Sequence, residues 1–314
     1  MNPMNQHQSG RLPWLACPLG AALACAVLRR WQLASAFEEN TGLAVPGAQA
    51  SVILTCVLVM SAAWFTILAV AQPLPNRPAG PARRWDLVFL GAGDPVYPVL
   101  VILAAFLALA AVPFLLKTGT GQWQAYREAV AARKLNPSVQ LPSNNGMLAI
   151  ATAVGALLSF LGLLQMGRDG LNAGRRGKGG FSATLPGIAG CVWLMESFRA
   201  HAANPVRWDY APLLLAIVCG MLLYMDFAGM STGASRPRRL LWVAAMTLVI
   251  SAPALASALA EGAAADALLL GAQAMTAIAV LWRLSPALEN PSAPKRTPIP
   301  RPGEASIQEE TTDE

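Results

Sequence analysis

Long apolar stretches alternate with short polar connections along most of the chain. The clearest, residues 51–71, contains no charge, no proline and no glycine. At about 1.5 Å per residue, such a helix would cross roughly 30 Å, the thickness of the hydrocarbon core of a bilayer. The pattern therefore predicts an all-α, polytopic transmembrane helix bundle of about eight spans, near residues 12–28, 51–71, 95–116, 147–166, 181–198, 211–230, 240–260 and 263–282.

The spans divide the chain into two parts. Residues 1–284 are predicted to form one transmembrane domain. Residues 285–314 are rich in proline and then in acidic side chains, a composition that cannot bury a core. We expect this segment to be a disordered cytoplasmic tail.

Three segments depart from the simple pattern. The span at 12–28 ends in a faint lipoprotein-like cleavage site at residues 22–25, but the spans that follow it favour an uncleaved first helix. The span at 181–198 is the weakest because it carries Pro186 and Glu196. The connection at 117–146 is long enough for a short interfacial helix with one aromatic face.

Composition supports a lipid environment. Apolar residues make up 55% of the chain and charged residues 13%, against about 25% charged in soluble domains. The net charge of +6 comes from lysines and arginines that gather in the connections between spans, and no nucleic-acid module is present, so nucleic acid is not an expected partner. The expected partners are the bilayer and either another protein or a second copy of the chain.

The positive charges also predict an orientation. With both termini inside, most of the 23 lysines and arginines fall in cytoplasmic connections and terminal segments. Without the span at 181–198, the later connections change sides and this bias is lost. We therefore expect eight spans and an N-in/C-in topology. The lack of organelle signals favours the bacterial cytoplasmic (inner) membrane.

Cysteine and histidine give no sign of a metal or a cofactor. The five cysteines lie in apolar segments without a CxxC pair, which is typical of small buried side chains. The two histidines cannot supply a bis-histidine haem site within the bilayer. We predict no cofactor and no metal.

One short motif suggests an enzyme. Residues 91–94 match the GxGD phrase of intramembrane aspartyl proteases, in which two carboxylates share a proton to activate water. Asp94 would then work with Asp226, although the order of the two aspartates departs from that family. The alternative is a helix N-cap, because Asp94 precedes Pro95.

Three acids lie in or beside apolar spans: Glu196, Asp226 and Asp266. A carboxylate at such depth needs a partner, a proton or water, so each is a candidate functional residue. Asp226 lies deepest and is the favoured candidate for a proton, cation or substrate role. The alternative is an interhelical hydrogen bond, or a salt bridge to an arginine among residues 236–239.

The connection at 167–180 is basic and rich in glycine. Arg175, Arg176 and Lys178 lie among these glycines without the spacing of a P-loop. We expect them to form a flexible cytoplasmic loop whose positive charges maintain the topology, or to contact anionic lipid head groups.

The first hairpin carries a second family resemblance. Between residues 35 and 47 the chain contains AFE, TGL and PG in that order. This pattern resembles the first hairpin of a group of uncharacterised bacterial multi-pass membrane proteins. The resemblance covers about twenty residues and implies no activity. Pro46 and Gly47 are typical of a turn.

These observations favour a non-enzymatic protein. It would be a small-solute permease or the membrane subunit of a larger assembly, and a sensor is not separable from these by sequence. The alternative is an intramembrane aspartyl hydrolase that uses Asp94 and Asp226.

Overall fold

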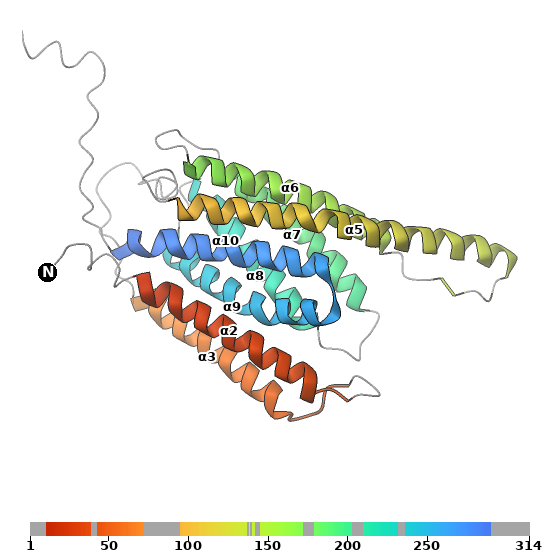
Figure 1. Cartoon of the computed structure of the whole chain (residues 1–314), viewed down its shortest axis with the longest axis horizontal. Coiled ribbons are helices and arrows are strands. Elements are labelled where there is room, and N and C mark those ends of the chain that lie inside the picture. The colour runs from red at the N-terminus through yellow and green to blue at the C-terminus, as the bar shows by residue number, and fades with distance from the viewer. Residues whose placement is uncertain are drawn as a thin grey trace, which may run out of the picture.

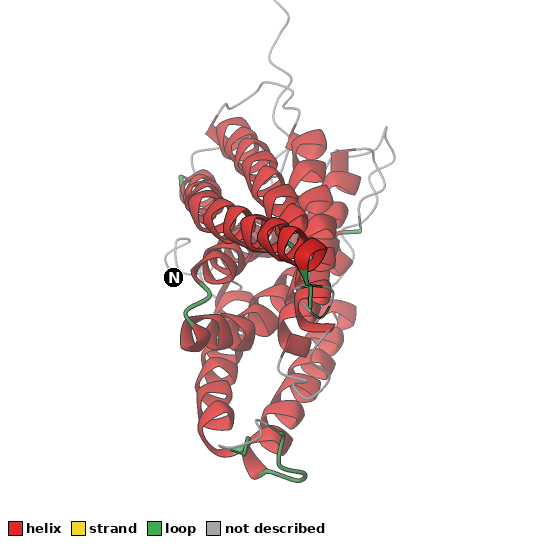
Figure 2. Ribbon diagram, turned by 90° about the vertical axis from the view of Figure 1, so that its right-hand side faces the viewer, coloured by secondary structure: helices red, strands yellow, loops and turns green. Residues whose placement is uncertain are grey.

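The computed structural model shows an all-helical architecture (Figures 1 and 2). It describes residues 11–38, 43–71, 95–136, 138, 140–141, 145–171, 179–202, 210–231 and 236–289. These residues form eight helices and no strands. The helices are α2 (Arg11–Ser35), α3 (Gln49–Ala71), α5 (Val96–Leu135), α6 (Gly146–Leu171), α7 (Gly179–Ala202), α8 (Ala211–Ser231), α9 (Pro237–Glu261) and α10 (Ala264–Glu289).

Six of the helices, namely α3, α5, α6, α8, α9 and α10, are long and apolar enough to cross a membrane. They indicate a multi-pass membrane protein. The predicted spans at 12–28 and 181–198 do form helices, but α2 and α7 are not among these six. Both contain charge: Arg29 and Arg30 lie within α2, and Glu196 and Arg199 lie within α7.

Helices α5 to α10 form a ring. Each packs against the next in chain order, and α10 closes the ring against α5. Helices α2 and α3 pack outside it, where α2 contacts α9 and α10, and α3 contacts α2 and α9. Figure 1 shows this pair on the side of the bundle opposite α5 and α6. Among the six apolar helices, α9 is the most buried and α3 the least.

Close contact between α6 and α7 depends on small residues. The sequence suggests a contact stripe of Ala151, Gly155 and Ser159, and the structure buries Gly155 and Ser159 but leaves Ala151 exposed. The closest approach is at Gly162, where an added Cβ atom would lie 2.5 Å from the Ser182 carbonyl oxygen. Such contacts let helix backbones approach in a lipid environment.

Helix α5 differs from the prediction. A span followed by a separate interfacial helix was expected, but Val96–Leu135 is one continuous helix of 40 residues, about 60 Å long. Gly119 packs against Gly146 at the start of α6, so the part of α5 beyond Trp123 has no α6 segment beside it. Figure 1 shows this arm extending past the other helices. The helix contains Pro113 and continues through Lys117 without ending.

The remaining predicted boundaries are close to those observed. The hairpin after α2 closes through an antiparallel bridge between Phe37 and Ala44, and Gly47 has φ +73° in the predicted turn. Helix α5 begins at Val96 with Pro95 at its N-cap position and no side-chain cap, so the predicted cap at Asp94, with Pro95 as the first helical residue, is wrong by one position. Helix α10 continues to Glu289, five residues into the segment predicted as a tail, and the rest of that segment lies outside the described residues.

Candidate functional site

Four helix ends surround a cavity of about 170 Å³, which we name the end cavity. They are the last turns of α7 and α9 and the first turns of α8 and α10, and Gly262, with φ +71°, makes the tight turn from α9 to α10. The apolar part of the lining is mostly alanine, which leaves the space open. The polar lining consists of His201, Tyr210, Ser257, Glu261 and Asp266.

Asp266 is the centre of the polar contacts at this cavity. The indole nitrogen of Trp193 donates a hydrogen bond of 2.9 Å to its Oδ1 atom. Asp266 also interacts electrostatically with Glu196 and with His201. The His201 ring stacks on Tyr210 with centroids 5.3 Å apart. Because Asp266 lies in the first turn of α10, the helix dipole also stabilises its charge.

A second polar group from outside the ring reaches the same end. Arg29 of α2 is buried, and its Nε atom donates a hydrogen bond of 2.8 Å to the hydroxyl of Ser257. Its Nη1 atom lies 2.6 Å from the amide oxygen of Gln32. A guanidinium within α2 is therefore held by partners on α2 and α9, and α2 is fastened to the ring beside the end cavity.

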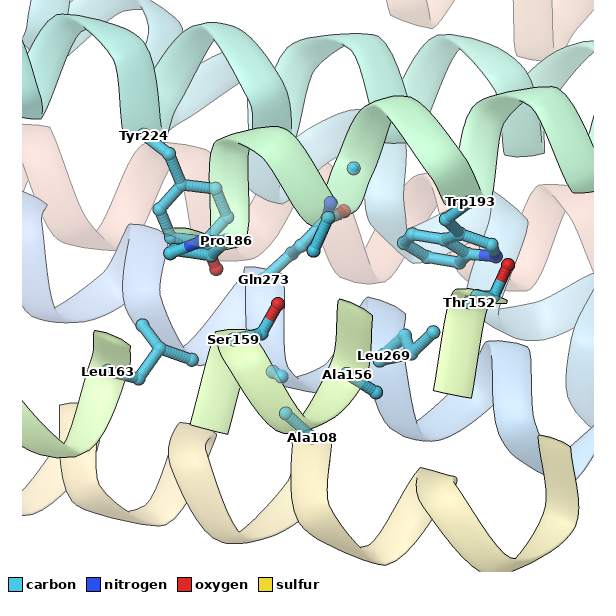
Figure 3. A pocket seen from close by; sticks show the side chains of 13 residues that line it. Ala108, Thr152, Ala156, Ser159, Leu163, Pro186, Trp193, Tyr224, Leu269 and Gln273 are labelled. Carbon is cyan, nitrogen blue, oxygen red and sulfur yellow. The ribbon is translucent and has the colours of Figure 1, made fainter. Parts of the chain in front are cut away.

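A smaller cavity, of about 30 Å³, lies inside the ring, and we name it the central cavity. Side chains of α5, α6, α7, α8 and α10 line it (Figure 3). Most of its lining is apolar, but a cavity of this size with polar groups in its wall can hold one or two water molecules, since one water needs about 10–15 Å³ of such space. Its polar lining consists of Thr152, Ser159, Trp193, Tyr224 and Gln273.

The two cavities meet at Trp193. Its indole ring lines the central cavity, while its N–H group bonds to Asp266, which lines the end cavity. Asp266, Leu269 and Gln273 are spaced three and four residues apart on α10, so they lie on one face of that helix. The end cavity and the central cavity therefore follow one another along α10, with Trp193 between them.

Asp226, the favoured sequence candidate, lies at the opposite end of α8. Its Oδ2 atom is 2.9 Å from Nε of Arg239 on α9. Leu213, near the start of α8, lines the end cavity, and Asp226 comes thirteen residues later, about 20 Å along the helix. The structure thus pairs Asp226 with one of the arginines named as an alternative, and it places Glu196 at the other end of the bundle.

The other sequence candidates cannot be placed. Asp94 lies outside the described residues, as do Arg175, Arg176 and Lys178. The described residues contain no group of three or more His, Cys, Asp or Glu side chains that could hold a metal ion.

Sequence reasoning named Asp266 as a candidate but missed Trp193 and the contact between the two residues. Trp193 and Asp266 are 73 residues apart, and nothing local in the sequence predicts their contact. Gln273 can be recognised in the sequence as a polar residue in the middle of the predicted span at 263–282. An amide at that position in lipid needs a hydrogen-bond partner. That signal identifies a polar residue but not the cavity around it.

Comparison with known proteins adds no relative. No protein-family model matches the chain, and neither a search of curated proteins nor a search of solved structures finds a similar one.

Proposed function

We propose that the chain is a small-solute permease whose path runs through the ring of α5 to α10. The observation that carries this proposal is the succession of two cavities lined by helices of one ring. Trp193 lines the smaller cavity and donates a hydrogen bond to Asp266, which lines the larger one. A bundle that served only as a scaffold would gain packing by filling these spaces, because voids in a close-packed interior are destabilising. Here alanines and polar side chains keep them open.

The proposed orientation places the end cavity on the outer side. Eight spans with both termini in the cytoplasm put most of the lysines and arginines inside. The turn between α9 and α10 and the long arm of α5 would then face outward, and Figure 1 shows them at the same end of the bundle. Arg175, Arg176 and Lys178 would lie on the cytoplasmic side, where anionic head groups are available. The membrane would be the bacterial cytoplasmic membrane.

A membrane subunit of a larger assembly is the second candidate. The observation in its favour is the arm of α5, which extends beyond the start of α6 and ends at the highly exposed Leu135. A subunit would copurify with a stoichiometric protein partner in mild detergent. A second copy of the chain would appear in the same experiment as a doubled mass.

The intramembrane hydrolase receives less support. Its mechanism needs two carboxylates that share a proton. The Oδ2 atom of Asp226 instead contacts the guanidinium of Arg239.

The permease is tested by reconstituting the purified protein in liposomes and measuring entry of neutral solutes of increasing size. Trp193→Ala should join the two cavities, so that the size limit rises and solutes excluded by the wild type pass. Trp64→Ala, at an exposed position on α3, is the matched control and should leave the size limit unchanged. Flux equal to that of protein-free liposomes in both the wild type and Trp193→Ala would contradict the proposal.

A further inference from the structure

Gln273 is a buried polar residue without a complete set of partners. Its side chain is only 5% exposed, and its Oε1 atom has no hydrogen-bond partner among the described residues. A buried acceptor that is left unbonded is costly, and most such groups in folded proteins are bonded to protein or to ordered water. The amide projects into the central cavity, where Figure 3 shows it between Tyr224 and Trp193. The missing donor therefore belongs in that cavity.

The neighbouring helix is shaped to hold this amide in place. A Cβ atom added at Gly220 on α8 would collide with Nε2 and Cδ of Gln273 and would lie 2.9 Å from Oε1. Only glycine at this position lets Gln273 extend from α10 as far as α8. If the side chain of Gln273 only filled space, α8 would not need a glycine opposite it.

The other polar groups around the cavity leave room for a guest. The Thr152 hydroxyl donates to the carbonyl oxygen of Leu148 at 2.9 Å, and the Tyr224 hydroxyl is directed to Thr276 at 3.4 Å. The hydroxyl of Ser159 lines the cavity from α6, the helix facing α10 across it (Figure 3). A guest can therefore meet an acceptor on α10 and hydroxyl groups on α6.

Size and charge limit what the guest can be. A space of about 30 Å³ admits one or two molecules of the size of water. Among the described residues, no Asp, Glu, Lys or Arg side chain lines it, so an ion would lose its hydration without gaining an opposite charge. A neutral molecule with at least one N–H or O–H donor satisfies both limits.

We propose that the central cavity is a binding site for a neutral molecule of the size of water or ammonia, which donates a hydrogen bond to Oε1 of Gln273. The conclusion that this molecule is transported rests on the proposed permease function. The conclusion that the central cavity binds it does not depend on that function.

The transport arm of the test uses the full chain in liposomes. Stopped-flow light scattering after an osmotic step measures water entry, and an enclosed pH dye measures ammonia entry. Gln273→Leu should lower the protein-dependent rate by about tenfold, the equivalent of one lost hydrogen bond. Gly220→Ala should lower it as well, since its methyl group displaces the amide. Gln124→Leu and Gly121→Ala, both on the exposed arm of α5, are the matched controls and should keep the wild-type rate.

The binding arm does not depend on flux. X-ray hydroxyl-radical footprinting oxidises buried side chains that have a bound water beside them, and Tyr224 and Trp193 are the reporters. The wild type should be oxidised at both, and Gln273→Leu should lose most of this oxidation while its melting temperature shows that it is folded. A footprint that depends on Gln273, without any flux in the wild type, would uphold the binding site and overturn the permease.

Other outcomes decide the remaining points. Water flux without ammonia flux, or the reverse, upholds the site and identifies its guest. Equal rates and equal footprints in the wild type and in folded Gln273→Leu would overturn the site. Entry of glycerol through the wild type at a rate close to that of water would overturn the size limit.

Discussion

The two ends of α8 carry similar chemistry in different surroundings. At one end, Asp226 lies against Arg239, and the pair joins α8 to α9. At the other end, Asp266 faces a cavity of about 170 Å³ beside His201 and Tyr210, and its direct donor is the indole of Trp193. A carboxylate in contact with an arginine has its charge compensated within the fold. A carboxylate that faces a cavity keeps part of its hydrogen-bonding capacity for what enters it.

This comparison changes which acid we regard as functional. By depth in the sequence, Asp226 is the favoured candidate. By surroundings, Asp266 is the better one, because it borders an open space and is hydrogen-bonded to Trp193, which lines a second cavity. Burial alone therefore does not distinguish a structural carboxylate from one at a functional site. The group that compensates the charge of the carboxylate does distinguish them.

The largest expected effect on stability comes from the hydrogen bond between Trp193 and Asp266. Trp193→Phe keeps an aromatic ring between the cavities but removes the N–H donor. We expect a loss of about 2 kcal/mol in the free energy of unfolding, as is typical of hydrogen bonds to charged groups. Unfolding in detergent micelles measures it, with Trp64→Phe on exposed α3 as the control. A change no larger than that of the control would show that Asp266 does not depend on this donor.

A smaller effect is expected for the ion pair at the other end. Asp226 is 16% exposed and Arg239 is 45% exposed, so water screens their attraction. A double-mutant cycle with Asp226→Asn and Arg239→Gln should give a coupling energy of about 1 kcal/mol or less. Solute flux should be unchanged in the folded single variants. Loss of flux in Asp226→Asn, with normal stability, would return the transport role to Asp226.

The smallest effect, with the opposite sign, is expected for Glu196. Its carboxylate interacts with that of Asp266, and two like charges near each other destabilise the folded state. Glu196→Gln removes this repulsion and should raise the free energy of unfolding by less than about 1 kcal/mol. The same unfolding assay detects it. A decrease in stability would mean that Glu196 makes a favourable contact that outweighs the repulsion.

Most of the helices could be predicted from the sequence. Apolar runs of the right length are a local property, and each predicted span coincides with a helix. Within the described part of the chain, six of these helices are long and apolar enough by themselves to cross a membrane. The continuity of α5 through Lys117 is not evident from the sequence, because a charged residue after an apolar run is also typical of the end of a span. A helix in water tolerates lysine without breaking.

Little of the candidate site could be predicted. The partner of Asp226 was among the alternatives, since the basic start of α9 follows α8 closely in the chain. The contact between Trp193 and Asp266 depends on how α7 and α10 pack. The close approach of Gln273 to Gly220, where a larger residue would collide, depends on how α8 and α10 pack. Such packing involves residues far apart in sequence, and one sequence carries no local pattern for it.

The central claim is that solute enters by the end cavity. We would test it in a chain without its native cysteines by placing one cysteine at Ala258, which lines the end cavity, or one at Asp226, at the other end of α8. A bulky cationic thiol reagent is added, and labelling is measured by mass spectrometry beside solute flux. The account predicts that labelling blocks flux in Ala258→Cys and leaves it unchanged in Asp226→Cys. Undiminished flux through fully labelled Ala258→Cys would contradict it.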